Sequence, residues 1–443
     1  MCGKTRFRIL CALAAISFPS NLASAETMQS AVAEALRTHP AINGAQAGLN
    51  SAEHARAAER AGFFPKLSVD FTGGRVYQDN STSRGLTVTR GAAYSGYAEG
   101  NVALRQMMFD GLETTNRVNA ADARMKARDY SLLDAEDQIT LRTVDSYIEI
   151  LRLRAALNLL NDYTDKIKSY EERITDMVVE GVADEVERQQ ARDVSMVMES
   201  LRADYEGQIV AIRAAYFEAV GAMPPENMEE PPSLTSYIID DIPSVVQTVK
   251  AAHPLIQSAR MDSQAARFEM KAVNSDFYPS VTGELSYNKL DKKDIVGGEN
   301  IDARAVVRMN WDISLGGREF SALREKTFDH AEARAKAEEI EREIERDIYQ
   351  KYAQYKTYKR KYNLARDRVD LNKKLLDAYS TQFEGARVNL LQLMKAEGQL
   401  FNALLEESDN RFYLLSSEYN VLASTGKLRS TLMQTGETPV TGE

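Results

Sequence analysis

Residues 31–71 read AVAEALRTHPAINGAQAGLNSAEHARAAERAGFFPKLSVDF, and residues 245–285 read VVQTVKAAHPLIQSARMDSQAARFEMKAVNSDFYPSVTGEL. The two segments align without a gap. The His-Pro step at 39–40 falls on the His-Pro step at 253–254, and an aromatic pair followed by proline closes both segments. Matches at a single offset indicate an internal repeat, so the chain is predicted to consist of two similar halves.

Two-residue alternation of apolar and polar residues follows the repeated segment in each half. In residues 301–311, apolar positions from Ile301 to Trp311 alternate with mainly polar ones such as Asp302 and Arg304. This pattern predicts strands with one apolar and one polar face. The polar loop at 78–91 is interpreted as a plain hairpin connection in preference to an extracellular loop that contacts a substrate or phage, and a similar polar loop lies at 291–300. The chain is therefore predicted to contain four strands, at about 67–72, 94–104, 284–288 and 301–312.

A long helical segment is predicted after each hairpin, beyond a glycine turn at Gly111 in the first half and at Gly316 and Gly317 in the second. No proline or glycine occurs from about 112 to 180, and apolar residues there keep the 3,4 spacing of a coiled coil. The second half repeats the pattern from about 318 to 384. At 1.5 Å per residue, each helix would be roughly 100 Å long.

Each long helix is predicted to end at a Glu-Gly step, because Gly181 and Gly385 can take the left-handed conformation that stops a helix. A return helix follows each turn, at about 186–220 and 388–423. Prolines then forbid a continuous helix between the halves. The predicted division is a signal peptide at 1–25, a first repeat at 26–222, a linker at 223–243, a second repeat at 244–424 and a polar, poorly ordered tail at 425–443.

The first 25 residues resemble a secretory signal peptide. Three basic residues precede a short apolar run, and Ala23-Ser24-Ala25 provides a cleavage site. Both cysteines, Cys2 and Cys11, lie in this segment, so the exported chain is expected to have no disulfide. Loss of three basic residues takes the formal net charge from −10 to −13. An acidic, exported chain is not expected to bind nucleic acid.

The two His-Pro steps have a chemical and a structural interpretation. A metal or catalytic pair would need His39 and His253 to converge, and no ligand set with suitable spacing accompanies them. The structural interpretation is favoured: Pro40 and Pro254 mark a break or first turn in each opening helix. Asparagine should then replace either histidine without loss of export. No nucleotide, metalloprotease or hydrolase motif occurs, so neither an enzyme nor a cofactor is expected.

This order of elements, with a His-Pro step early in each half, resembles the TolC family of outer-membrane efflux proteins over essentially the whole mature chain. The resemblance implies a mainly α fold with a β-barrel part, in which three chains close a twelve-stranded barrel in outer-membrane lipid and continue as a long α-helical periplasmic tunnel. It also implies a periplasmic adaptor and an inner-membrane ABC exporter or proton-driven pump as partners. The segments LRQMMFDG (104–111) and DYSLLDAE (129–136) resemble the subgroup that serves type I secretion of adhesins and agglutination proteins.

The same resemblance implies a gate at the two helix turns. The matching residues are Gly181, Gly385 and Arg387, and a link from Arg387 to Glu187 is a hypothesis that a double charge swap would test. Some family members have two aspartates after the second turn, where this chain has Leu391 and Met394. An apolar ring formed by these two residues, or Glu397 one turn later, is therefore expected to close the entrance.

Three functions remain open from the sequence. The first is a passive exit duct for type I protein secretion, located in the Gram-negative outer membrane with most of the chain in the periplasm. The second is a duct for small-molecule or multidrug efflux. The third, from a different class, is a periplasmic coiled-coil scaffold without a pore.

Overall fold

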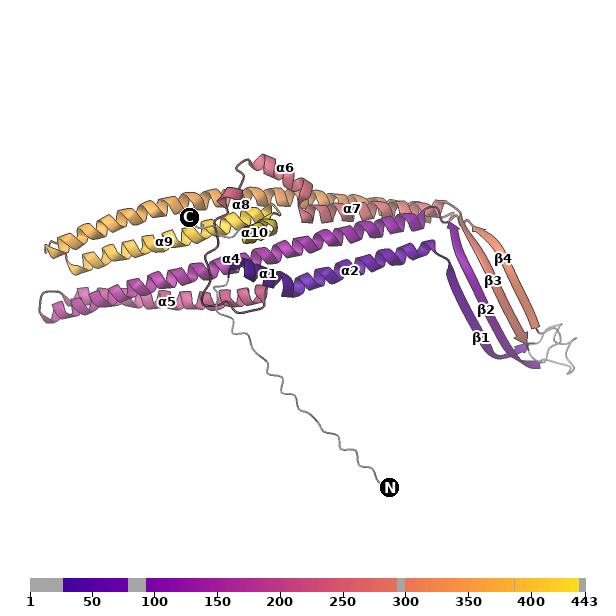
Figure 1. Ribbon diagram of the computed structural model, residues 1–443, viewed down its shortest axis with the longest axis horizontal. Helices are drawn as coiled ribbons and strands as arrows, with labels where there is room; N and C mark the ends of the chain where they lie inside the picture. The colour runs from indigo at the N-terminus through magenta and orange to yellow at the C-terminus, as the bar shows by residue number, and fades with distance from the viewer. Residues whose placement is uncertain (1–26, 79–92, 293–298, 386, 438–443) are drawn as a thin grey trace, which may run out of the picture.

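The computed structural model describes residues 27–78, 93–292, 299–385 and 387–437, so the predicted signal peptide, most of loop 78–91 and residues 438–443 lie outside it. The molecule is elongated: long helices run side by side, a sheet lies at one end and two helix turns lie at the other (Figure 1). The elements of the first half are α1 (Met28–Thr38), α2 (Pro40–Arg60), η1 (Ala61–Phe63), β1 (Lys66–Gln78), β2 (Ala93–Phe109), α4 (Glu113–Val179) and α5 (Glu185–Val220). Those of the second half are η2 (Thr235–Tyr237), α6 (Ile242–Ala252), α7 (Pro254–Val273), η3 (Asn274–Phe277), β3 (Ser280–Lys292), β4 (Glu299–Asn310), α8 (Arg318–Glu384), α9 (Leu390–Ser424) and α10 (Leu428–Glu437).

The four strands form one antiparallel sheet in the order β1-β2-β3-β4, which confirms the predicted strand count. The two halves meet inside this sheet, where β2 pairs with β3 and Val102 lies opposite Tyr287. The register shifts between Met107 and Phe109, which makes a bulge at the helix-facing end of β2. One face of the sheet exposes apolar side chains, among them Leu67, Val69, Phe71, Leu285, Ile301, Val307 and Met309.

The two long helices have the same length, since α4 and α8 each contain 67 residues. Both begin after a residue in the left-handed region, Leu112 with φ 70° and Gly317 with φ 70°. Toward the end of the molecule that carries the two helix turns, α4 packs against α5 and α9, and α9 packs against α8. None of the described helices is both long enough and apolar enough to cross a membrane.

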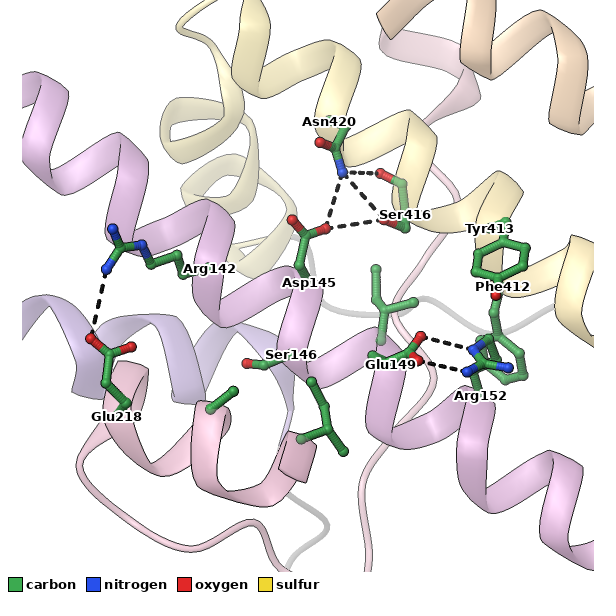
Figure 2. A pocket seen from close by; sticks show the side chains of 13 residues that line it. Arg142, Asp145, Ser146, Glu149, Arg152, Glu218, Phe412, Tyr413, Ser416 and Asn420 are labelled. Atoms are coloured by element: carbon green, nitrogen blue, oxygen red, sulfur yellow. Dashed lines mark hydrogen bonds and ion pairs between the residues drawn. The ribbon is translucent and has the colours of Figure 1, made fainter. Parts of the chain in front are cut away.

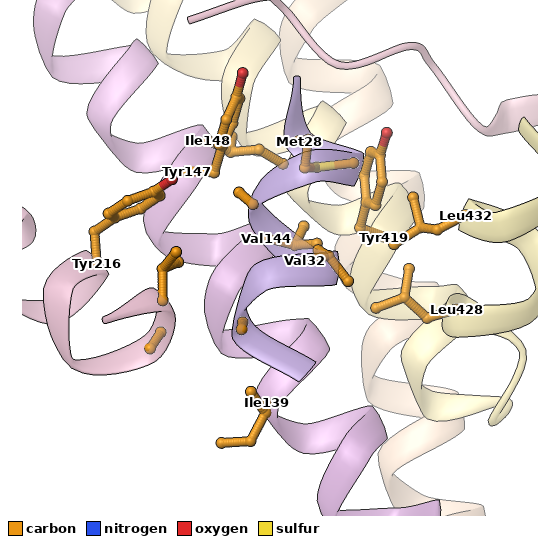
Figure 3. Close-up of a cluster of buried hydrophobic side chains, with 14 of the residues drawn as sticks. Met28, Val32, Ile139, Val144, Tyr147, Ile148, Tyr216, Tyr419, Leu428 and Leu432 are labelled. Carbon is orange, nitrogen blue, oxygen red and sulfur yellow. The ribbon is translucent and has the colours of Figure 1, made fainter. Parts of the chain in front are cut away.

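A central core forms where α1, α5, α9 and α10 surround the middle of α4 (Figure 3). Tyr147, Tyr216 and Tyr419 are fully buried there. Leu428 and Leu432, which are 0% and 3% exposed, attach α10 to this core. The expectation of a poorly ordered tail from residue 425 is therefore wrong for residues 428–437. The sequence of α10 is polar overall, but its two leucines are spaced one helical turn apart and reach a single apolar site.

The segment between the halves, which we call the strap (residues 223–241), lies against the helices although it has almost no regular structure. Its prolines lack N–H groups, so regular structure in the strap is limited to the short helix η2, and side chains of the long helices bind carbonyl groups of the strap instead. Tyr147 Oη donates to the Glu229 carbonyl at 2.8 Å, and Tyr419 Oη donates to the Pro232 carbonyl at 2.8 Å.

The buried carboxylate of Glu418, which is 3% exposed, holds the next part of the strap. It accepts hydrogen bonds from Ser233 Oγ at 2.8 Å, the Leu234 N–H at 2.7 Å and Thr235 Oγ1 at 2.6 Å. A single side chain of α9 thus satisfies three donors of the strap.

Candidate functional site

The α4–α5 turn is closed by a glycine in the left-handed conformation, Gly181 with φ +77°. The Val182 N–H donates to the Met177 carbonyl at 2.8 Å, and the Gly181 N–H donates to the Val178 carbonyl at 3.1 Å. These two bonds define a Schellman motif, which satisfies the last carbonyls of α4. Nothing lies within 4 Å of a Cβ built on Gly181, so its conformation rather than crowding favours glycine.

The α8–α9 turn is built differently, and the expectation of a left-handed Gly385 is wrong. Gly385 has φ −81° and ψ 9° and is the C-cap of α8. The closing hydrogen bond runs from the Arg387 N–H to the Gln382 carbonyl at 2.9 Å. In the first half the glycine of the Glu-Gly step follows the C-cap residue, whereas in the second half the glycine is itself the C-cap residue. Gly385 therefore stays right-handed.

Glu187 joins the two turns, but through a partner that the sequence did not indicate. Its Oε1 accepts a hydrogen bond from Asn389 Nδ2 at 2.6 Å. No ion pair between Glu187 and Arg387 occurs in the part of the chain that the structure describes. Asn389 is also the N-cap of α9 and forms a capping box with Gln392. The Asn-x-x-Gln spacing in the sequence was a signal for this role.

Leu391 and Met394, which the sequence suggested as an apolar ring at the entrance, are buried within the chain. They are 9% and 2% exposed and belong to a core cluster that joins α4, α5, α8 and α9. Leu390 and Leu393 are buried in the same cluster, so two adjacent faces of α9 are covered. We therefore assign Leu391 and Met394 to holding the helical pairs together within one chain.

Glu397 is also buried, at 7% exposed, and its carboxylate lies 3.2 Å from Lys166 Nζ on α4. Burial, and then the nearby Glu397 carboxylate, raise the pKa of Tyr163 to about 12. Tyr163 therefore stays neutral at physiological pH, and its ring stacks on Phe401 with centroids 4.3 Å apart. This contact lies between α4 and α9, one of the seams between the helical pairs.

Gly398 in the middle of α9 leaves room for Tyr163. A Cβ at this position would lie 2.9 Å from Tyr163 Oη, whereas a Cβ on Gly207 in α5 would meet nothing within 4 Å. These two helical glycines therefore form a matched pair for testing the seam.

We expect Gly207→Ala to stabilise the protein by about 0.5–1 kcal/mol, because alanine loses less backbone entropy in a helix. Gly398→Ala should instead destabilise it, by about 1–2 kcal/mol, because overpacking outweighs that gain. Denaturant unfolding of the purified protein measures both. Tyr163→Phe, combined with Gly398→Ala, removes the clashing oxygen and should restore part of the lost stability. A Gly398→Ala variant as stable as Gly207→Ala would contradict the close packing of α4 against α9.

The His-Pro steps are helix junctions. Pro40 is the first residue of α2 and Pro254 the first residue of α7. His39 Nδ1 accepts a hydrogen bond from the Ala41 N–H at 3.1 Å, and His253 Nδ1 accepts one from the Leu255 N–H at 3.2 Å. Each histidine thus ends one helix and caps the next. Asparagine is a good N-cap residue, which gives a physical reason for the expected tolerance of His→Asn.

The glycines between sheet and helix differ in their surroundings. Gly111 has φ +64°, and a Cβ there would lie 3.0 Å from Ser275 Cα and 3.1 Å from the Ser275 carbonyl oxygen. Gly317 has φ +70° but open space around it, and Gly316 has neither constraint. Only Gly111 combines a left-handed backbone with close backbone contact across the two halves.

Asp137 lies on α4, beside the half-buried Arg429 of α10. Glu136 pairs with the Arg429 guanidinium, and Arg429 Nε lies 3.9 Å from Asp137 Oδ1. Burial, and then the negative charge of Asp134, raise the pKa of Asp137 to about 7. An acid whose folded-state pKa is raised loses stability as pH rises from its unfolded pKa near 4 to about 7, and the loss is complete above that range.

We therefore expect Asp137→Asn to raise stability near pH 7.5, by on the order of 2–4 kcal/mol, and to flatten the pH dependence between about pH 5 and 7. Thermal unfolding of both proteins at about pH 5 and at pH 7.5 measures this. The exposed Asp193 provides a control, since Asp193→Asn should change neither value. If Asp137→Asn is the less stable protein at both pH values, attraction to Arg429 dominates.

Comparison with known proteins agrees with this architecture. A family model described as "Outer membrane efflux protein" matches residues 31–222 and 245–427. The outer membrane efflux protein BepC of Brucella suis biovar 1 (strain 1330) is 22% identical over 415 residues, which cover 92% of this chain and 86% of BepC.

Solved structures show the same fold at low identity. The outer membrane protein VceC of Vibrio cholerae superposes with a TM-score of 0.78 at 17% identity, covering 90% of this chain and 96% of VceC. The CmeC outer membrane channel of Campylobacter jejuni superposes with a TM-score of 0.77 at 14% identity, covering 99% of this chain and 97% of CmeC. The TolC-like fold that the family resemblance implied is confirmed. The chain therefore belongs to the outer membrane efflux protein family: it is an efflux channel of the Gram-negative outer membrane rather than an enzyme.

Proposed function

We propose that three copies of this chain close a twelve-stranded barrel and form a passive exit duct. The observation that carries this proposal is the open sheet: β1 and β4 are its edges, and among the described strands β1 pairs only with β2 and β4 only with β3. An unpaired edge is too costly in hydrocarbon, and four strands cannot close a barrel alone. The apolar face of the sheet would then meet lipid, and the opposite face, with Asp70, Asn101, Asn288 and Asp302, would line the lumen.

The helices would continue this lumen into the periplasm. A helix of 67 residues is roughly 100 Å long. In this proposal residues 26–222 and 244–424 are repeated half-units. An inner-membrane ABC exporter or proton-driven pump supplies the energy, and a periplasmic adaptor contacts the turns near Gly181 and Gly385.

The gate would lie at these turns. The contact from Asn389 to Glu187 supports this, because it joins the α4–α5 pair to the α8–α9 pair at the tip. Opening would separate the two pairs and break that hydrogen bond. Arg387 is exposed at the turn and would be available to an adaptor, while Leu391, Met394 and Glu397 would stabilise the closed packing.

For the substrate, we propose protein export by a type I system, which the resemblance of residues 104–111 and 129–136 to that subgroup supports. Small-molecule efflux is the second candidate. It is supported by the description of the matched family and of BepC as efflux proteins.

Deletion of the gene tests both candidates. Loss of a large secreted protein from the medium, restored by complementation, supports type I secretion, whereas drug hypersensitivity with an unchanged secreted proteome supports efflux. Reconstitution of the purified protein in lipid bilayers tests the duct itself. Single-channel conductance is expected, and its repeated absence would favour the scaffold without a pore.

A further inference from the structure

A cavity of about 590 Å³ lies between α4, α5 and α9, away from the turns and from the sheet (Figure 2). This volume is in the range of small-molecule sites. Asp145, Glu149 and Arg152 of α4 line it, and they share one face of the helix by their spacing. Tyr147 and Arg154 point away from that face and bind the strap. The cavity therefore lies on the side of α4 that the strap leaves open.

Most charges in the cavity wall are paired within the wall. Arg152, which is 6% exposed, donates to Glu149 at 2.8 and 2.6 Å and to Asp409 at 2.7 Å. At the rim, Arg142 lies 3.6 Å from Glu218. Each guanidinium thus has at least one carboxylate partner.

Asp145 is different. Its Oδ1 accepts hydrogen bonds from Ser416 Oγ and Asn420 Nδ2, each at 3.0 Å, and both donors are neutral. In the described part of the chain, no lysine, arginine or histidine nitrogen lies within ion-pair distance of its carboxylate. The nearby Lys351 Nζ donates to Asn420 Oδ1 at 2.8 Å instead. The cavity wall therefore carries one carboxylate that the Lys351 charge influences but that makes no direct ion pair in the described part of the chain.

The rest of the wall is mainly apolar. It is lined by Ile148 of α4, Ile212 and the exposed Ala215 of α5, and Phe412 and Tyr413 of α9. A ligand that fits this wall needs an apolar body and one positive charge close to Asp145. Aromatic rings also favour contact with a cation.

We propose that this cavity binds an amphipathic monovalent cation, with an amine or quaternary ammonium group at Asp145 and an apolar body against Ile148, Ile212 and Phe412. If the duct of the proposed function turns this face of α4 toward its lumen, the site would retain such cations on their way through. The binding itself does not depend on that proposal and can be measured on the purified full-length protein.

The test is a calorimetric titration of the purified protein, in mildly alkaline buffer, with benzyltrimethylammonium. Benzenesulfonate and benzyl alcohol serve as anionic and neutral probes of similar size. Saturable binding of the cation alone is expected. Asp145→Asn keeps the hydrogen bonds from Ser416 and Asn420 but removes the charge, so it should weaken binding at least tenfold.

Two further variants separate the site from general effects on the fold. Ala215→Leu puts a larger side chain at an exposed position of the cavity lining and should also abolish binding, without removing any charged group. Glu206→Gln, a change at an exposed carboxylate of α5 outside the cavity, should bind as the wild type does. Wild-type affinity in both Asp145→Asn and Ala215→Leu would overturn the proposal, as would equal binding of benzenesulfonate or no saturable binding to the wild type.

Conductance measured on the same preparations keeps this inference distinct from the duct proposal. A conducting protein that binds no cation overturns the site alone. A protein that binds the cation but never conducts overturns the duct alone.

Discussion

Replacing Gly111 with alanine should destabilise the protein more than any other glycine replacement between sheet and helix, by about 3 kcal/mol or more. A left-handed alanine costs about 1–2 kcal/mol. The new Cβ would also press against the Ser275 backbone at 3.0 Å, and that backbone belongs to the turn that leads into β3. Because both halves meet at this point, we expect little folded protein to reach the outer membrane.

Two matched glycines make this prediction specific. Gly316→Ala should be neutral, because its surroundings are open and its φ is not positive, and Gly317→Ala should lose only the strain of a left-handed alanine. Denaturant unfolding of the three purified variants, together with the amount of each in outer-membrane fractions, should give the order Gly316, Gly317, Gly111 of increasing loss. A Gly111→Ala variant no worse than Gly317→Ala would show that the Ser275 backbone yields easily.

Removal of the Glu418 carboxylate should have a comparable effect. Glu418→Ala leaves the buried Leu234 N–H without its acceptor and opens a cavity beside it, so a loss of about 3 kcal/mol is expected. Glu418→Gln keeps the shape and one acceptor oxygen, which should limit the loss to about 1 kcal/mol. Thermal unfolding measures the difference.

Limited proteolysis adds a readout that is specific to the strap. In Glu418→Ala, cleavage within residues 223–241 should become faster, because the strap loses its hydrogen bonds to α9. The exposed Glu172 of α4 provides the control: Glu172→Ala should change neither stability nor the cleavage rate. If Glu418→Ala unfolds earlier but the strap is cleaved at the wild-type rate, the carboxylate stabilises the helices rather than the strap.

The sequence predicted the architecture because its signals are repeated and local. Helix lengths follow from where glycine and proline occur, and strand faces follow from alternation, so the boundaries of α4 and α8 agree with the prediction within one or two residues. In α8, Tyr352 and Tyr355 lie three residues apart on one face of the helix, and both are buried in a cluster with residues of α6.

The details at the turns could not be predicted in the same way. Gly385 and Gly181 both follow glutamate in the sequence, yet only Gly181 is left-handed, because the closing hydrogen bond forms at a different residue in each turn. Leu391 and Met394 were placed by their distance from Gly385, and distance along the chain does not tell which face of α9 meets its neighbours. The partner of Glu187 likewise depends on how two helical pairs approach one another.

The pairing of β2 with β3 has a consequence for assembly. A half-unit alone would supply one hairpin, so six separate halves would be needed for the twelve strands of the proposed barrel, in five association steps. When two halves are joined in one chain, three chains assemble in only two association steps. The other three steps become contacts between the halves of a single chain. Each association between separate chains costs about 4–15 kcal/mol in lost translational and rotational freedom. Duplication therefore removes much of the concentration dependence of channel assembly, and the strap, which keeps the second half close to the first, sets the effective concentration at which β3 finds β2.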